Sequence, residues 1–390
     1  MYRISRLQSL LKGISRSAFD RLVEQHGSDK HCKGFASWDQ LVVMVYAQIS
    51  GAQSLRQIEA GFNAHDTHHY HLGTQAISRS TLADANGKRD TAVFSALVKG
   101  LMAEAGRRLR RGAGELLYLL DSTSITLKGR EFDAWASANR TQHTQGLKLH
   151  LQYAPDAAHP VWHDFSAANV NDIDAVRDLT FERGARYVFD KGYCDYGWWA
   201  RIDEAGATFV TRFKRNAGLA VVESRPIDQA DAGVILADRL VKFKHYHSRG
   251  GKRLRYMKAL REVVVARPDR TDALVLATND LTSPAGEIAQ HYRQRWQIEL
   301  YFKWIKQHLR IKSFVGRSEN AVRTQILTAL ISYLLVAMYK QTHGIKDSLW
   351  MVLSQLRAAL FQVPAIDAHR YRIRKAREQF MSEHQPALFT

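Results

Sequence analysis

Two short apolar runs, each followed by an aspartate, place the tightest constraint on the fold of this chain. Residues 115–120 lead to Asp121, and residues 186–189 lead to Asp190. Runs of this length are typical of buried strands and are too short for buried helices. Helical and strand patterns alternate with them between residues 146 and 211. We therefore predict an α/β fold with a mixed sheet flanked by helices.

Changes of pattern, rather than linkers, divide the 390-residue chain, because its seven prolines form no Pro-rich segment. Helical spacing dominates the first hundred residues, where two short helices loosely resemble a helix-turn-helix and a plain helical bundle is the alternative. Alternating stretches around Gly250-Gly251 predict strands further on. We predict a helical N-terminal DNA-binding domain over 1–105 and a helical basic tail over 346–390. Between them we predict an α/β core in two parts, 113–212 and 284–345, separated by a β-rich insertion over 213–283.

The charge balance indicates a polyanionic partner. The chain has 56 Lys and Arg residues and 38 Asp and Glu residues, which gives a formal net charge of +18. An excess of this size is typical of proteins that bind nucleic acid. The densest cluster is residues 241–261, which hold eight basic residues and no acid, among them Lys252, Arg253 and Arg255. A basic hairpin here could follow a DNA backbone, or its lysines could simply protect a sheet edge.

The sequence argues against several classes of protein and of binding site. Cys32 and Cys194 are the only cysteines, which excludes a disulfide framework and favours a reducing cytosol. Four histidines between residues 65 and 71 lack the spacing of a zinc site. The sequence has no glycine-rich phosphate loop, so no nucleotide cofactor is expected. The longest apolar stretch, residues 326–339, predicts a buried helix and no membrane span.

The two strand-end aspartates are candidate site residues. Carboxylates at strand ends lie at the edge of a sheet, where strand ends and loops build sites. A lone aspartate in this position is more often a turn or capping residue, but Asp121 and Asp190 share one α/β unit. Asp172, Asp174 and Asp195 compete with them, although capping explains acids in loops and at helix starts.

A third candidate acid lies in a predicted helix over residues 291–310. At about 100° per residue, one narrow stripe carries Tyr292, Arg295, Glu299, Lys303 and Lys306. The neighbouring flank carries the apolar residues expected to face the sheet, namely Ile298, Phe302, Ile305 and Leu309. The alternative is a solvated face with salt bridges four residues apart.

Two aspartates and one glutamate can together hold two Mg²⁺ ions, because hard cations prefer oxygen ligands and retain several waters. Two such ions can activate the attacking oxygen and stabilise the leaving oxygen of a phosphoryl transfer. Tyr292, Arg295 and Lys306 would then hold neighbouring phosphates.

These motifs resemble the insertion-sequence-4 family of DDE transposases. That family carries Tyr-x2-Arg-x3-Glu-x6-Lys in its glutamate helix, and Tyr292, Arg295, Glu299 and Lys306 match the spacing. The segments around the two aspartates, residues 119–123 and 188–193, also match, and the resemblance covers about residues 113–340.

The resemblance implies an RNase H-like core in which Asp121, Asp190 and Glu299 are catalytic and bind two Mg²⁺ ions, with Mn²⁺ as a substitute. It implies cut-and-paste excision and strand transfer of an insertion sequence. The expected partner is double-stranded DNA, both terminal inverted repeats and target, bound by a homodimer at the nucleoid in a bacterial cytoplasm. Lys303 and the basic residues of the insertion are expected to contact DNA as well. The alternatives are a metal-dependent nuclease without strand transfer and a domesticated DNA-binding protein.

The resemblance also suggests that the reaction passes through a DNA hairpin intermediate. In relatives that form DNA hairpins, an aromatic residue of the insertion, often tryptophan, holds a flipped base. Residues 214–283 contain no tryptophan, so the available stacking groups are Phe243, Tyr246 and Tyr256. Trp198 and Trp199, just before the insertion, are expected to pack in the core.

Overall fold

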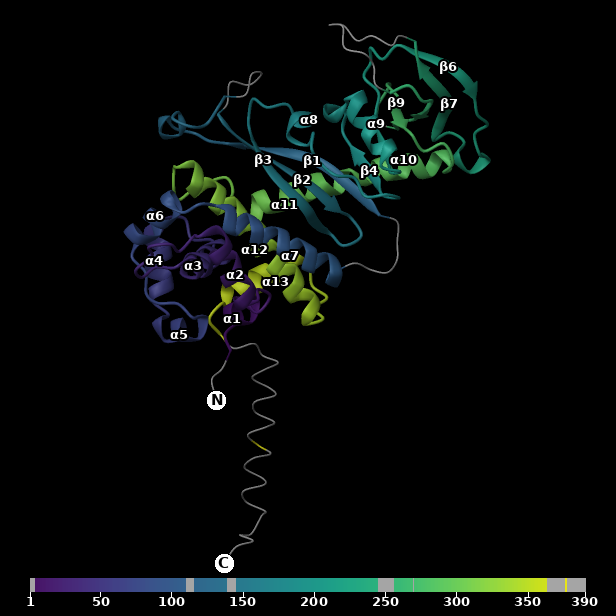
Figure 1. The fold of residues 1–390 in the computed structure, drawn as a ribbon. Coiled ribbons are helices and arrows are strands. Elements are labelled where there is room, and N and C mark those ends of the chain that lie inside the picture. The colour runs from purple at the N-terminus through teal and green to yellow at the C-terminus, as the bar shows by residue number, and fades with distance from the viewer. Residues whose placement is uncertain are drawn as a thin grey trace, which may run out of the picture. The chain divides into compact units, whose positions relative to one another are not determined.

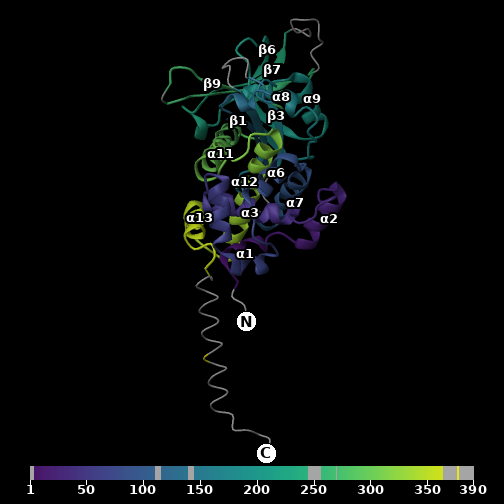
Figure 2. The ribbon, with the colours of Figure 1, turned by 90° about the vertical axis from the view of Figure 1, so that its left-hand side faces the viewer.

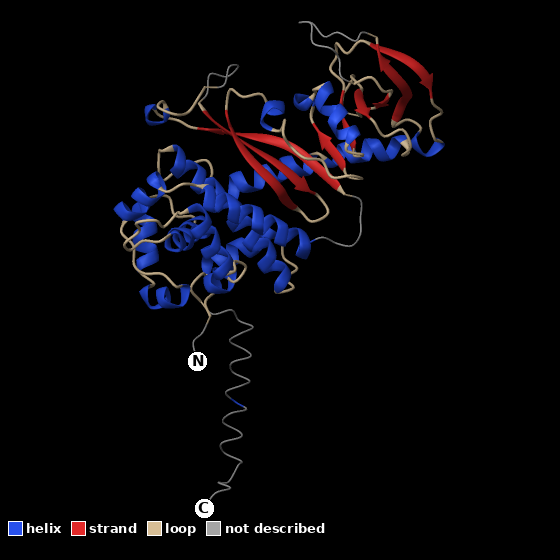
Figure 3. Cartoon of the chain, viewed as in Figure 1, coloured by secondary structure: helices blue, strands red, loops and turns tan. Residues whose placement is uncertain are grey.

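The computed structural model describes residues 4–109, 116–138, 145–244, 256–268, 270–362 and 376. These residues form two compact units, one of Met1–Leu101 with Gln307–Thr390 and one of Met102–Lys306. The first unit is helical and the second contains the strands (Figure 3). The candidate site residues all belong to the second unit.

The helical unit is built around two long buried helices. Its elements are α1 (Arg6–Leu11), α2 (Arg16–His26), α3 (Ser37–Ser50), α4 (Leu55–Asn63), η1 (Asp66–His68), α5 (His69–Leu72), α6 (Arg79–Lys88), the start of α7 (Ala92–Leu109), α12 (Glu319–Thr342) and α13 (Leu349–Ala358). The helices α3, α12 and α13 pack side by side, as two views show (Figures 1 and 2). Serine hydroxyls cap the first backbone N–H groups of most of these helices, which fixes where they begin.

The predicted buried helix of residues 326–339 is confirmed as the centre of α12. By length and composition α12 is the one helix among the described residues that could cross a membrane, but 89% of its apolar window is buried inside the protein. Its mostly apolar sequence therefore serves as the core of the helical unit.

The second unit contains one nine-stranded sheet in the order β3-β2-β1-β4-β5-β9-β8-β7-β6. Its strands are β1 (Leu117–Thr126), β2 (Gly146–Ala154), β3 (His159–Ala167), β4 (Arg186–Phe189), β5 (Thr208–Arg212), β6 (Leu219–Ser224), β7 (Ile235–Phe243), β8 (Leu260–Val265) and β9 (Leu274–Thr278). An antiparallel meander, β3-β2-β1, continues into the parallel strands β4 and β5, which is the RNase H-like arrangement. The predicted mixed α/β fold is confirmed.

The predicted insertion contributes strands to the same sheet. Strand β9 pairs with β5 in antiparallel register, and β8, β7 and β6 follow outward. Strand β6 was not expected, because its outer residues are exposed and show no alternation of apolar and polar positions. The predicted Gly250-Gly251 turn lies outside the described residues. The domain boundaries derived from the sequence stay a prediction.

The remaining elements of this unit are η2 (Arg130–Phe132), α8 (Asp172–Ala175), η3 (Lys191–Tyr193), α9 (Tyr196–Glu204), η4 (Gln229–Asp231), α10 (Ala285–Gln294) and α11 (Trp296–His308). The single helix predicted over residues 291–310 is wrong in one respect, because the chain breaks it at Arg295 between α10 and α11. The backbone N–H groups of Arg295 and Ile298 bond three residues back, to Tyr292 and Arg295, so the helix tightens locally. The predicted apolar flank of Ile298, Phe302, Ile305 and Leu309 is buried as expected.

The core of this unit lies between the sheet and α9. Trp198 and Trp199 of α9 are 2% and 0% exposed and pack against Phe189 and Phe209 of the central strands. The prediction that both tryptophans pack in the core is confirmed. This aromatic cluster holds β4 and β5 rigidly, which matters because Asp190 directly follows β4.

Candidate active site

Asp121 and Asp190 occupy equivalent places on neighbouring parallel strands. The last register pair of β1 and β4 is Leu120 with Phe189, so each aspartate is the next residue along its chain. The prediction that Asp121 ends its strand is wrong: β1 continues to Thr126, because residues beyond Asp121 pair with β2 on the other side. Asp121 instead lies where the parallel ladder ends, and this brings it beside Asp190.

Each aspartate is oriented by a local hydrogen bond. The Asp121 carboxylate accepts from the backbone N–H of Ser122 at 2.8 Å, and the Asp190 carboxylate accepts from that of Lys191 at 2.6 Å. Asp190 is also the N-cap of η3. Short acidic side chains readily form such bonds at turns and strand ends. The bonds fix the direction of both carboxylates from within their own segments.

Two arginines pair with the three candidate acids. The Arg295 guanidinium lies 2.6 Å from Glu299 Oε1 and 3.8 Å from Asp121 Oδ2. The Arg212 guanidinium, at the end of β5, lies 2.5 Å from Asp190 Oδ1. Arg295 therefore joins the glutamate helix to β1, while Arg212 compensates the second aspartate.

The local electrostatics separate the two aspartates. Burial raises the pKa of Asp121 to about 7, and the charges of Glu299 and Asp190 add to the rise while the Ser122 N–H and Arg295 oppose it. Burial also disfavours the charged form of Asp190, but hydrogen bonds from Arg212 and the Lys191 N–H hold the pKa of Asp190 below its ordinary value. Pairs of acids with separated pKa values are typical of functional sites, although structural ion-pair networks also produce them.

The donor set suits a hard divalent cation, since it consists of carboxylate oxygens alone. Arg295 and Arg212 place positive charge against all three acids and compensate their negative charge. Within the described ranges, no three His, Cys, Asp or Glu side chains are close enough to share one ion. The carboxylates fit a metal in their chemistry, and metal binding would require the arginines to release them.

Comparison with known proteins decides the family. Residues 112–335 match the family described as the transposase DDE domain. The chain belongs to the DDE transposase family. Residues 3–75 match a separate family, described as a domain of unknown function (DUF4372).

Three relatives are described as transposases. The protein y4zB of Sinorhizobium fredii is 45% identical over 65% of this chain and 69% of its own length. The protein of insertion sequence element IS5377 from Geobacillus stearothermophilus is 28% identical over 64% of each chain. That of element IS4SA from Synechocystis is 25% identical over 68% of this chain and 73% of its own. A solved piggyBac transposase complex with hairpin DNA aligns with 99% of this chain and 86% of its own, at 10% identity and a TM-score of 0.49.

The transposase is therefore an enzyme that cleaves DNA strands and transfers them, and DNA is its partner. DDE transposase domains generally use divalent metal ions, in agreement with the carboxylate set. The family match spans the segments of all three candidate acids.

The remaining residues of the predicted motif lie around the acids of the transposase. Tyr292 is 8% exposed, and its ring lies 5.7 Å from the Arg295 guanidinium carbon. Lys306 donates a hydrogen bond from Nζ to the Ser124 carbonyl oxygen at 2.9 Å, which ties α11 to β1. Lys303 is exposed on α11. Lys252, Arg253 and Arg255 lie outside the described residues.

The described aromatic side chains available to hold a flipped base are less exposed than that role requires. Tyr256 is 3% exposed and belongs to the hydrophobic core, and Phe243 packs against Tyr196 at 4.4 Å between ring centroids. Tyr246 lies outside the described residues. Tyr256 is therefore buried, and Phe243 is half-buried against α9.

Sequence reasoning missed Arg212. The signal was present, because Arg212 ends the apolar run of β5 just as Asp190 directly follows the apolar run of β4. Asp172, which competed with the two aspartates, accepts from Ser122 Oγ at 3.0 Å and pairs with Lys148 at 2.9 Å. Asp172 is thus engaged with β1 and β2, close to the candidate acids.

Proposed function

We propose that this transposase excises and inserts an insertion sequence by cut-and-paste, with Asp121, Asp190 and Glu299 as its catalytic carboxylates. The observation that carries the proposal is the placement of Asp121 and Asp190 on neighbouring strands, with Arg295 between Asp121 and Glu299. Two of the relatives are described as transposases of insertion sequence elements, IS5377 and IS4SA, which favours an insertion sequence as the mobile DNA.

The three carboxylates would hold two Mg²⁺ ions, with Mn²⁺ as a substitute. When bound, these ions would supply charge stabilisation at the attacked phosphate and its leaving oxygen. Arg295 and Arg212 would exchange carboxylate for phosphate oxygens, which their forked donors suit equally well. Lys306 would keep α11 against β1, so that Glu299 stays opposite Asp121.

We also propose membership of the insertion-sequence-4 group, supported by Tyr292, Arg295, Glu299 and Lys306 at that group's spacing. The DNA would be the terminal inverted repeats and a target, bound by a homodimer because two ends must be paired. The protein would act on the nucleoid of a bacterial cytoplasm. A hairpin intermediate stays a prediction. We retain residues 1–105 as the end-recognising domain and 113–212 with 284–345 as the catalytic core.

The decisive experiment is the substitution Glu299→Gln, assayed on DNA that carries the flanking repeats with Mg²⁺. We expect cleavage to fall on the order of 10³-fold or more, because glutamine lacks the charge that holds a hard cation. DNA binding should persist, because removing an anion lessens repulsion of phosphates. The matched control is Glu223→Gln, an exposed acid on β6, which should cleave as the wild type does.

Cleavage by Glu299→Gln at the wild-type rate would reject the site. The products of the wild type distinguish the alternatives. Joined strand-transfer products support the transposase, cleavage without joints supports the nuclease, and tight binding without cleavage supports the domesticated DNA-binding protein.

A further inference from the structure

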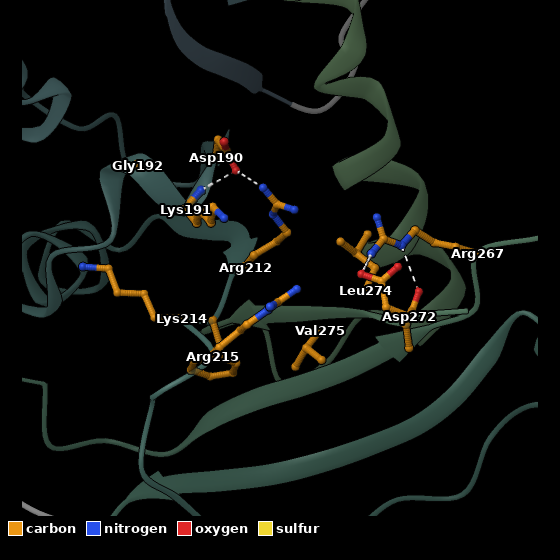
Figure 4. A pocket seen from close by; sticks show the side chains of 12 residues that line it. Asp190, Lys191, Gly192, Arg212, Lys214, Arg215, Arg267, Asp272, Leu274 and Val275 are labelled. Carbon is orange, nitrogen blue, oxygen red and sulfur yellow. Dashed lines mark hydrogen bonds and ion pairs between the residues drawn. The ribbon is translucent and has the colours of Figure 1, made fainter. Parts of the chain in front are cut away.

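A hollow of about 580 Å³ adjoins Asp190 on the side of the predicted insertion. We call it the basic pocket. Its lining comes from the residues just after β4, the end of β5 with the following loop, the loop before β9 and the first two residues of β9 (Figure 4). Asp190 belongs both to the candidate acids and to this lining, so the two sites are continuous.

Positive charge exceeds negative charge in the basic pocket. Arg212 is paired with Asp190, and Arg267 is paired with Asp272. These pairs leave Lys191, Lys214 and Arg215 without a carboxylate among the described residues. Unpaired basic groups gathered in a concave surface raise the local concentration of anions.

Arg215 is the basic residue best placed to meet a ligand. It is exposed, makes no hydrogen bond or ion pair with any described residue, and projects toward the middle of the group in Figure 4. Lys214 differs, because its Nζ donates to the Cys194 carbonyl oxygen at 3.2 Å. Arg215 thus keeps its forked donors available for phosphate oxygens.

The size and walls of the pocket select among anionic ligands. A hollow of about 580 Å³ can take a short stretch of a single strand, but it is too small to enclose a duplex, whose major groove alone is ~12 Å wide. Phe213, Leu274 and Val275 add an apolar wall beside the basic groups. Charge that follows a backbone, beside apolar surface, is how proteins bind unpaired strands.

We propose that the basic pocket binds the sugar–phosphate backbone of an unpaired DNA strand next to the active site. The proposal rests on the proposed function, because Asp190 places this strand beside the carboxylates that would act on it. The strand would be one that separates from its complement at the cleaved end. Arg215 would contact its phosphate, and Lys191 would stand between that phosphate and Asp190.

The test measures binding of Arg215→Gln without divalent metal, so that no cleavage occurs. Two probes share one duplex sequence, one blunt and one with a single-stranded 3′ extension. We expect affinity for the extended probe to fall about 10-fold, the loss of one charge-assisted bond. The slope of log affinity against log salt should fall by about 0.7, the value for one phosphate of a single strand. Binding of the blunt probe should not change.

The matched control is Arg183→Gln, an exposed arginine before β4, at the opposite end of that strand from Asp190. It should bind both probes as the wild type does. Equal losses of Arg215→Gln on both probes, or no loss on either, would overturn the proposal. Displacement of the extension by millimolar inorganic phosphate, but not by sulfate at equal ionic strength, would also overturn it, because the pocket would then be a free-phosphate site.

The two proposals fail separately. If Glu299→Gln still cleaves while Arg215→Gln loses the extended probe, the active-site assignment fails and the pocket stands. If Glu299→Gln is inactive while Arg215→Gln binds normally, the active site stands and the pocket fails.

Discussion

At the scale of single residues, the site is a balance between three carboxylates and two guanidinium groups. Arg295 lies against Glu299 and Asp121, and Arg212 lies against Asp190. A divalent cation and Arg295 therefore compete for the same oxygens. The raised pKa of Asp121, about 7, shows that one guanidinium does not fully offset the burial of that acid.

Arg295→Gln should bind Mn²⁺ more tightly, roughly 10-fold, because it removes a competing positive charge from partly buried carboxylates. Calorimetric titration of the protein without DNA measures this directly. Arg293→Gln, an exposed neighbour on α10, serves as the control and should leave Mn²⁺ affinity unchanged. Weaker Mn²⁺ binding by Arg295→Gln would show that the guanidinium orients the acids rather than competing for them.

At the scale of elements, the glutamate helix is held by buried ion pairs. Arg186 of β4 pairs with Asp280 at 2.9 Å, and both side chains are almost fully buried. The same arginine hydrogen-bonds His291 of α10 at 3.1 Å. Arg261 of β8 pairs with Asp238 of β7 at 2.7 Å and donates to the Ser283 carbonyl oxygen. These contacts fix the segment between β9 and α10. They therefore also fix the position of α10, which leads into the helix α11 that carries Glu299.

Asp280→Asn should lower the free energy of unfolding at pH 7 by roughly 3 kcal/mol, because it leaves Arg186 buried without its anion. Burial disfavours the Asp280 carboxylate, yet hydrogen bonds from Ser283 and Thr282 and the charge of Arg186 hold its pKa well below the usual range. A lowered folded-state pKa stabilises the protein above about pH 4, the unfolded value, and this contribution is lost as the pH falls further.

Denaturant unfolding at several pH values tests this. The difference between wild type and Asp280→Asn should shrink below about pH 4. Asp228→Asn, on an exposed turn, is the control. A difference that stays constant down to pH 2 would show that Asp280 acts through packing instead of charge.

At the scale of the whole molecule, the net charge of +18 has a functional consequence. The family establishes DNA as the partner, and a polyanion bound by many basic groups releases its counterions. Affinity for DNA should therefore depend steeply on salt.

If about 6–10 phosphates are neutralised, affinity for duplex DNA should fall on the order of 10³–10⁵-fold between roughly 50 and 200 mM salt. Fluorescence anisotropy with one duplex over a salt series measures the slope. A nearly flat response would mean that the basic excess does not serve DNA binding.

Local chemistry determined much of this protein. Short apolar runs predicted the strands β1 and β4, which position Asp121 and Asp190, and the helical period predicted which residues of α11 are buried. These features follow from the chain's immediate neighbours, since the side-chain period of a strand or helix requires no distant contact. The same local logic extends to Arg212, at the end of β5.

Only the tertiary structure decided how those residues combine. Asp121 lies within β1 because β2 pairs with the residues beyond it, a choice made by a strand far along the chain. Arg295 breaks its helix where it reaches Asp121 on one side and Glu299 on the other. Tyr256 is buried in the core, and Phe243 packs half-buried against α9, because the insertion joins the sheet next to α9. Such pairings depend on strand register and on distances in space, and the period of a single segment contains no information about either.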